Sequence, residues 1–369
     1  MRRLTLVLAV AAGVLAGCGS SKPKPMALES FKPTIAGREV WSARLDSVEF
    51  PLTVVVRDGK FRVAGSDGSV VVFDAQSGQE LSRAKVAAKL AAGVGSDGRF
   101  DAVVTVGNEL VVLEGAREVW RQRLSSRVVT APLVAGERVF VMGVDRVVHA
   151  FDVLDGRRLW KLQRPSDALT LSQAGIVVPF KDTLVVGQGP RLTGLDPLRG
   201  SVQWEVAMAA PRGTNEVERL ADLLGPPLRL GDRICARSFQ SAVACADVAK
   251  GTLLWSRNVG GTQPIGGNVT AIFGADGTDR VGAWRTDTGE VLWSNEKMLY
   301  RGLSAPLAVG PSVVFGDAEG YVHFLSAATG EAQLRLPTDG SPVVAAPVLS
   351  GTTMLVVTRK GGLHAFRPN

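Results

Sequence analysis

The amino-acid sequence predicts an all-β fold, namely an eight-bladed β-propeller of four-stranded antiparallel blades. A phrase that ends in tryptophan, or in a leucine that takes its place, recurs at spacings of 38 to 51 residues. It ends at Trp41, Leu81, Trp120, Trp160, Trp204, Trp255, Trp293 and Leu334. The chain also carries 42 glycines among 369 residues, above the usual share of about 7%, which indicates many turns between short elements. Units of about 40 residues with four strands each have the size of propeller blades.

The repeat at residues 131–160 shows how one unit supplies its strands. Apolar and β-branched runs predict strands at residues 131–134, 138–142 and 147–151, and a fourth strand opens at residue 158. Turns that carry Gly or Asp separate these runs. The same order of Asp, Gly and Trp or Leu recurs at Asp74, Gly78 and Leu81, at Asp152, Gly156 and Trp160, at Asp196, Gly200 and Trp204, and at Asp247, Gly251 and Trp255.

The two ends of the repeat array predict how the ring closes. Residues 39–42 form a fourth strand with no first three before it, whereas residues 343–349, 353–358 and 363–366 form three strands with no fourth after them. One blade cannot bury both of its faces alone, so blades must pack side by side. We therefore expect the N-terminal strand to pair with the C-terminal strands, which makes residues 37–369 a single domain.

The N-terminus predicts export and a lipid anchor. Residues 1–17 combine a short basic start with an apolar stretch of about twelve residues, which is typical of a signal peptide. The cleavage site, ending in Cys18, closely resembles the lipobox of bacterial lipoproteins, in which the cysteine is lipidated. The alternative is an ordinary secretory signal with an incidental cysteine. Residues 18–36 then form the lipidated N-terminus and a flexible tether.

Composition and charge disfavour two classes of function. The net charge is +7, but the Lys and Arg residues are dispersed, so we expect no nucleic-acid partner. Three histidines and two tyrosines leave few candidates for acid–base catalysis, and no catalytic residue is predicted. Residues 93–98 match a dinucleotide-binding glycine pattern, yet a strand at residues 99–106 follows where that motif needs a helix. We interpret them as a turn.

Two further groups of residues have a structural interpretation. His149, His323 and His364 occupy the same point of the third strand in separate repeats, so they are spread around the ring and no metal site is expected. Cys235 and Cys245 lie on successive strands, five residues either side of Gln240, where the hairpin turns. They should face one another across the pair and form a disulfide. The alternative is two buried free cysteines.

The repeat phrase also carries a family resemblance. Its Gly-x-(Val/Leu)-x-Ala-(Leu/Phe)-Asp-x-x-x-Gly-x-x-x-Trp form resembles the repeats of quinoprotein-like propellers. Together with Cys18 and the segments at residues 215–222 and 314–321, it makes the chain similar to the BamB family of outer-membrane protein assembly factors. The resemblance implies a non-enzymatic scaffold without a cofactor, anchored at the periplasmic face of the outer membrane. The implied partners are the POTRA domains of BamA, other subunits of the BAM complex and unfolded outer-membrane protein clients, and the lipid anchor is the one implied membrane contact.

The resemblance implies a partner-binding surface on loops at one end of the propeller. The matching positions are Leu169 and Leu171 in one segment and Arg219 and Asp222 in another. The alternatives are burial of the leucines in the first strand of a blade and a solvated helical turn for the charged pair.

Two departures from the family pattern affect the charged part of this surface. Ser172 stands where an arginine usually follows, and Leu224 where a second aspartate is common. The long spacing from Trp204 to Trp255 independently predicts a protruding loop at residues 210–227.

Two other functions compete with the scaffold. One is a quinoprotein dehydrogenase that uses pyrroloquinoline quinone and calcium, which would need convergent oxygen ligands that the spacing does not show. The other is a propeller lipoprotein that binds a different envelope protein, because a fold does not determine a function.

Overall fold

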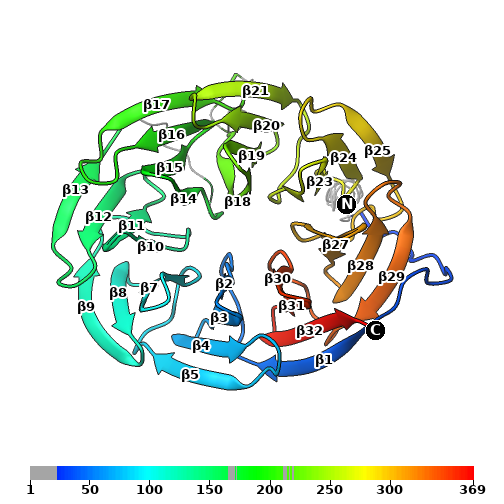
Figure 1. Cartoon of the computed structure of the whole chain (residues 1–369), viewed down its shortest axis with the longest axis horizontal. Coiled ribbons are helices and arrows are strands. Elements are labelled where there is room, and N and C mark those ends of the chain that lie inside the picture. The colour runs from blue at the N-terminus through cyan, green and yellow to red at the C-terminus, as the bar shows by residue number, and fades with distance from the viewer. Residues whose placement is uncertain (1–22, 165–170, 172, 211–213, 216, 218–219) are drawn as a thin grey trace, which may run out of the picture.

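The computed structural model describes residues 23–164, 171, 173–210, 214–215, 217 and 220–369. These residues form 32 strands in eight four-stranded antiparallel sheets, arranged as blades around a ring (Figure 1). The predicted eight-bladed propeller is confirmed. Within this described part of the chain, no helix has the length and apolar character needed to cross a membrane.

Each of the first seven blades uses four consecutive strands. Blade 1 contains β2 (Val55–Arg57), β3 (Lys60–Ala64), β4 (Ser69–Asp74) and β5 (Glu80–Lys85). Blade 2 contains β6 (Gly95–Ser96), β7 (Phe100–Val104), β8 (Glu109–Glu114) and β9 (Arg117–Arg123). Blade 3 contains β10 (Leu133–Ala135), β11 (Arg138–Met142), β12 (Val148–Asp152) and β13 (Arg158–Leu162). Blade 4 contains β14 (Val177–Phe180), β15 (Thr183–Gln188), β16 (Arg191–Leu195) and β17 (Val202–Ala207).

The remaining blades complete the ring. Blade 5 contains β18 (Leu223–Leu230), β19 (Arg233–Ser238), β20 (Ala242–Asp247) and β21 (Thr252–Arg257). Blade 6 contains β22 (Gly266–Gly267), β23 (Ala271–Ala275), β24 (Val281–Arg285) and β25 (Val291–Asn295). Blade 7 contains β26 (Leu307–Val309), β27 (Ser312–Gly316), β28 (Tyr321–Ser326) and β29 (Ala332–Pro337). Blade 8 joins β30 (Val348–Ser350), β31 (Thr353–Val357) and β32 (Gly362–Pro368) to β1 (Gly37–Arg44).

Blade 8 closes the ring as the sequence predicted. Strand β1 pairs with β32 from the Gly37–Pro368 contact to the Arg44–Gly362 contact, and the first and last strands lie side by side in Figure 1. Strand β32 also pairs with β31, so it is the central link between the two ends of the chain.

The strand predictions hold with small shifts and three corrections. Strand β11 has the predicted bounds. Residues 93–98 are not simply the predicted turn, because Gly95–Ser96 form β6, which pairs with β7. A strand and not a helix follows them, as predicted. The predicted strand at residues 343–349 is wrong at its start, because β30 begins at Val348 and Val343 forms an isolated bridge. The predicted loop at residues 210–227 is too long, because β18 already begins at Leu223.

The hydrophobic core lies between neighbouring blades rather than within one sheet. One cluster joins Phe100 and Val112 of blade 2 to Val139 and Phe151 of blade 3, all of them buried. The glycine and the tryptophan that recur in the repeats meet at these boundaries.

The tryptophan of one blade binds the third turn of the next blade. The Trp120 indole Nε1–H donates to the Val153 carbonyl at 2.7 Å. The ring also lies against Gly156, where an added Cβ would stand 2.6 Å from the Trp120 Cδ2 atom. The same indole-to-carbonyl bond joins Trp41 to Ala75, Trp160 to Pro197, Trp255 to Thr286 and Trp293 to Ala327.

The two leucines that replace tryptophan lie where the next blade lacks this turn. Leu81 faces blade 2, whose β8–β9 hairpin turns tightly at Gly115, and no atom lies within 4 Å of a Cβ added there. Leu81 is correspondingly 45% exposed. Leu334 faces blade 8, where the outer strands belong to opposite ends of the chain, and it approaches Gly37 instead.

We predict that Gly156→Ala destabilises the protein far more than Gly136→Ala. Both glycines have positive φ, +73° and +57°, but a Cβ at Gly136 meets no atom within 4 Å. Left-handed backbone strain should cost about 1 kcal/mol at either site, and overpacking against Trp120 about 2 kcal/mol more at Gly156. Equal losses in denaturant unfolding would contradict the contact between blades.

Removal of residues 361–369 is expected to destabilise the whole domain. It deletes β32 and leaves both β1 and β31 with unpaired edges. We expect the melting temperature to fall by about 10 °C or more, whereas removal of Asn369 alone should leave it unchanged. An unchanged melting temperature in the longer truncation would show that ring closure does not stabilise the domain.

Candidate functional site

The candidate site lies on the face of the ring that carries the loops between blades. In each antiparallel blade, the loop that enters the first strand and the hairpin between the second and third strands lie at the same end. Leu171 precedes β14, and Asp222 precedes β18, so both predicted residues lie on this face. Leu169 and Arg219, and the departure at Ser172, lie outside the described residues.

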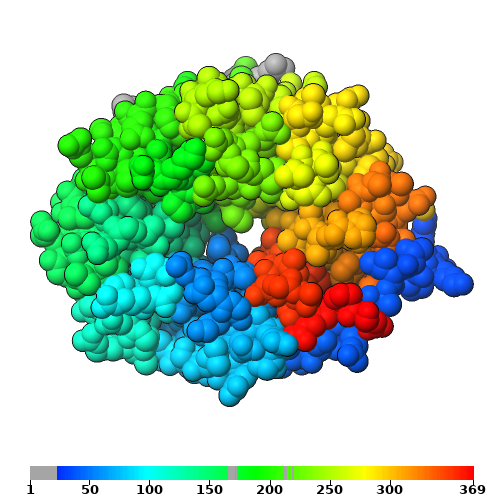
Figure 2. Space-filling model, viewed as in Figure 1, coloured from blue at the N-terminus to red at the C-terminus, as the bar shows by residue number. Residues whose placement is uncertain are grey.

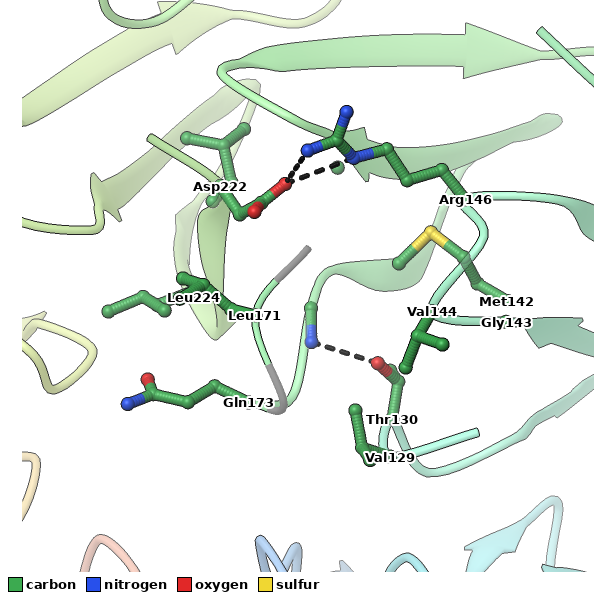
Figure 3. A pocket seen from close by; sticks show the side chains of 13 residues that line it. Val129, Thr130, Met142, Gly143, Val144, Arg146, Leu171, Gln173, Asp222 and Leu224 are labelled. Atoms are coloured by element: carbon green, nitrogen blue, oxygen red, sulfur yellow. Dashed lines mark hydrogen bonds and ion pairs between the residues drawn. The ribbon is translucent and has the colours of Figure 1, made fainter. Parts of the chain in front are cut away.

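Both described residues line one small depression (Figure 3). Leu171 is half-buried in a loop, so it does not occupy the first strand of a blade. The loop that follows it is fixed by the Gly175 amide, which donates to Thr130 Oγ1 at 2.8 Å. The cavity volume is about 40 Å³, far below the several hundred Å³ of small-molecule sites. The depression therefore suits contact with a protein surface rather than enclosure of a ligand.

Asp222 forms an ion pair that the sequence did not predict. Arg146, in the β11–β12 hairpin, donates from Nη2 and Nε to Asp222 Oδ1 at 2.8 and 3.1 Å. Each side chain is 15% exposed, so Asp222 is not part of a solvated helical turn. Gln188 Nε2 donates to the Arg146 carbonyl at 2.9 Å and fixes the hairpin. The other carboxylate oxygen, Oδ2, is buried and has no hydrogen-bond partner among the described residues.

The backbone around Asp222 is tied to two blades. The Asp222 carbonyl accepts from the Phe239 amide, and the Leu223 amide donates to the Gly189 carbonyl, each at 2.9 Å. Leu224, where the family pattern has an acid, is 2% exposed at the start of β18. The site therefore presents one acid held in place beside apolar side chains.

A fully buried arginine supports the strand beneath this loop. Arg237 lies opposite Leu224 in the β18–β19 pair and donates from Nη1 to the Val259 and Gly260 carbonyls at 3.1 and 2.6 Å. Burial lowers the pKa of Arg237 to about 10. The sequence signal for it is a single charge within the apolar strand of residues 234–238, which the repeat analysis did not weigh.

A larger cavity of about 670 Å³ opens among the loops of blades 1 and 4 to 8, and Figure 2 shows a hollow at the centre of the ring. Most of its lining is apolar, and its charged residues are Glu49 and Arg359. Throughout the described ranges, no group of three His, Cys, Asp or Glu side chains could hold a metal ion. The cavity thus shows no set of charged oxygen ligands of the kind a calcium ion requires.

The three histidines are buried in blades 3, 7 and 8. Burial lowers the pKa of His149 and of His323. His323 Nε2 lies 2.9 Å from Asp317 Oδ2, and His364 Nδ1 lies 3.2 Å from Glu39 Oε1. Each histidine thus has its own surroundings in a separate blade.

Cys235 and Cys245 face one another in the register of β19 and β20, with a Cα–Cα distance of 4.0 Å, and their sulfur atoms are joined. Both are fully buried, in a cluster with Trp255 and Trp284. The bridge closes a hairpin within blade 5 and lies away from the depression.

We expect no free thiol in the denatured, unreduced chain lacking residues 1–18, in which Cys235 and Cys245 are the two remaining cysteines. The double variant Cys235→Ser, Cys245→Ser should lose about 3 kcal/mol of unfolding free energy, because a short bridge restricts the unfolded chain. Two free thiols in a colorimetric count would show that the cysteines are not bridged.

Comparison with known proteins identifies relatives over the whole length. A family model described as "Outer membrane protein assembly factor BamB" matches residues 66–295 and 277–369. A protein of that name from Burkholderia pseudomallei is 34% identical over 377 residues, covering 100% of this chain and 99% of the relative. Another from Bordetella pertussis is 33% identical over 372 residues, covering 99% and 96%.

A solved structure shares the fold. The crystal structure of BamB from Moraxella catarrhalis superposes with a TM-score of 0.81 at 22% identity, covering 90% of this chain and 99% of that one. A quinohemoprotein alcohol dehydrogenase from Comamonas testosteroni and a europium-containing methanol dehydrogenase are also structural neighbours, each with a TM-score of 0.68 and at 16% and 12% identity, and this likeness shows the fold alone.

Proposed function

Because this chain belongs to the BamB family of outer membrane protein assembly factors, we propose that it is a non-enzymatic scaffold of the β-barrel assembly machinery. In this proposal it binds the periplasmic POTRA domains of BamA and assists the folding and insertion of outer-membrane proteins. Lipidation at Cys18 anchors it to the periplasmic face of the outer membrane. The full-length similarity to assembly factors is the observation that carries the proposal.

The binding surface in this proposal is the depression that contains Leu171 and Asp222. Segments of blades 3, 4 and 5 meet there, and hydrogen bonds of Thr130, Gln188 and Phe239 hold described residues of these segments. Residues that such bonds already hold in place lose little conformational entropy on binding. That favours recognition of a folded domain over recognition of a small ligand.

The residues of the depression have different roles in the proposed binding. Leu171 offers apolar area in the loop, and Asp222 offers the small exposed part of a carboxylate that is paired with Arg146, because its Oδ2 atom is itself buried. Arg146 is a positioning residue here, because its largely buried guanidinium holds the Asp222 carboxylate in place.

Titration of the purified protein with the POTRA domains of BamA tests this proposal. Leu171→Glu and Asp222→Arg should each raise Kd by about tenfold or more, because each removes a central contact and introduces a charge that the partner does not match. The matched controls are Leu154→Glu and Asp155→Arg, at exposed positions of the β12–β13 hairpin on the opposite face.

The controls should bind as the unchanged protein does, and they and Leu171→Glu should keep its melting temperature. Asp222→Arg should lower the melting temperature, because it places a second cation beside the largely buried Arg146, so Leu171→Glu is the variant that separates binding from stability. Loss of binding without a change in melting temperature supports the surface. Unchanged binding by Leu171→Glu and Asp222→Arg would exclude this surface, and no binding by the unchanged protein would favour a different envelope partner.

A further inference from the structure

The segment before the first strand is fixed to blade 7. Residues 26–36, here called the N-terminal arm, follow the predicted lipidation site, and the sequence predicted a flexible tether up to residue 36. In the structure the Met26 amide donates to the Leu299 carbonyl at 2.9 Å, and the Thr34 amide donates to the Gln333 carbonyl at 3.0 Å. The arm is therefore hydrogen-bonded to blade 7 at both ends.

Side chains hold the arm between those two points. The Arg335 guanidinium lies 5.1 Å from the centre of the Phe31 ring, and it donates to the Glu29 carbonyl at 3.3 Å. Lys297 Nζ lies 2.8 Å from Glu29 Oε2. These contacts come from the loop before β26 and from β29, so the arm runs along the outer edge of blade 7 (Figure 1).

The end of the arm nearest Cys18 rests on a buried charge network. Arg301 Nη1 donates to the Met26 carbonyl at 2.8 Å. The Arg301 side chain is 2% exposed and donates from Nε and Nη2 to Asp317, which is fully buried. A guanidinium held by a buried carboxylate cannot follow a mobile chain, so Met26 has a fixed place on the ring.

Met26 is fixed on the face that carries the candidate site. Leu299 and Arg301 lie in the loop that enters the first strand of blade 7, which is at the same end of the blades as Leu171 and Asp222. Residues 19–25, here called the linker, separate Met26 from Cys18. The eight Cα–Cα steps from Cys18 to Met26 reach at most about 29 Å, whereas the nineteen steps of a tether running to Gly37 would reach about 68 Å.

We propose that the arm fixes the orientation of the propeller on the lipid surface, with the Met26 end of blade 7 held next to the membrane. The proposal rests on the lipid anchor of the proposed function and adds to it which part of the ring faces the bilayer. The short linker sets the distance, and the contacts of the arm set the direction.

Quenching of a fluorophore by spin-labelled lipid headgroups tests the orientation. The probes are attached to Ala318→Cys in blade 7 and Val106→Cys in blade 2, equivalent exposed positions of the hairpin between second and third strands on the same face. In the lipidated full-length protein reconstituted in nanodiscs, we expect about threefold stronger quenching at position 318, because the linker restricts only the blade 7 side to about 29 Å.

Two variants test separately the length of the linker and the contacts of the arm. Insertion of about twenty Gly and Ser residues between Lys24 and Pro25 lengthens the linker and should remove the difference while the Met26 and Thr34 amides stay protected from hydrogen exchange. The double variant Phe31→Ala, Arg335→Ala should release the middle of the arm, raise exchange at Thr34 and reduce the difference. Both labelled proteins must retain protection at Met26, which shows that the label leaves the arm in place.

The outcomes distinguish this proposal from the proposed function. Mass spectrometry of the N-terminal peptide shows whether Cys18 carries lipid, and an unmodified Cys18 overturns the anchor and with it the orientation. A lipidated chain with equal quenching at the two positions overturns the orientation alone. Exchange at Met26 and Thr34 as fast as in an unstructured peptide overturns the fixed arm.

Discussion

The contact between a tryptophan and the third turn of the next blade is the constraint on which the ring depends. The indole N–H bonds to a backbone carbonyl, and its ring fills the space that a glycine leaves open, as Trp120 does beside Gly156. Each sheet has two faces, so it can be buried only when a neighbour is held at a fixed distance. Because the apolar clusters lie between blades, this spacing also sets the packing of the core. Closure by β1 and β32 then leaves no blade without a neighbour.

The same arrangement separates stability from recognition. The tryptophan contacts use the hairpins between third and fourth strands, and these lie at one end of the blades. The candidate site uses the loops at the other end. Residues there can change without disturbing the contact that spaces the blades. Loops on a rigid scaffold are where function is expected to vary.

The repeated features of the fold could be predicted from the sequence, whereas single contacts between distant residues could not. The blades, the ring closure and the cysteine register follow from local spacing, because each repeat encodes the same unit. The Arg146–Asp222 pair joins residues 76 positions apart in different blades, and nothing in either repeat marks the partner. The fixed arm was missed for the same reason. Met26 and Arg301 are 275 positions apart. The proline and lysine residues before residue 26 predict a flexible segment, but they say nothing of the contacts that the following residues make with the ring.

These long-range contacts bear on how a modest surface could support stable association. Asp222 already shares its charge with Arg146, so a partner gains less from it than from an unpaired carboxylate. Leu224 is buried and uncharged, so apolar area and confinement must supply more of the binding. If the proposed lipid and the fixed arm hold, shortening the reach from about 68 to about 29 Å reduces the volume available to the propeller roughly tenfold. Its effective concentration near a membrane-embedded partner rises by the same factor. Met26 lies on the same face of the ring as the depression. The higher effective concentration therefore applies to the surface where binding is proposed.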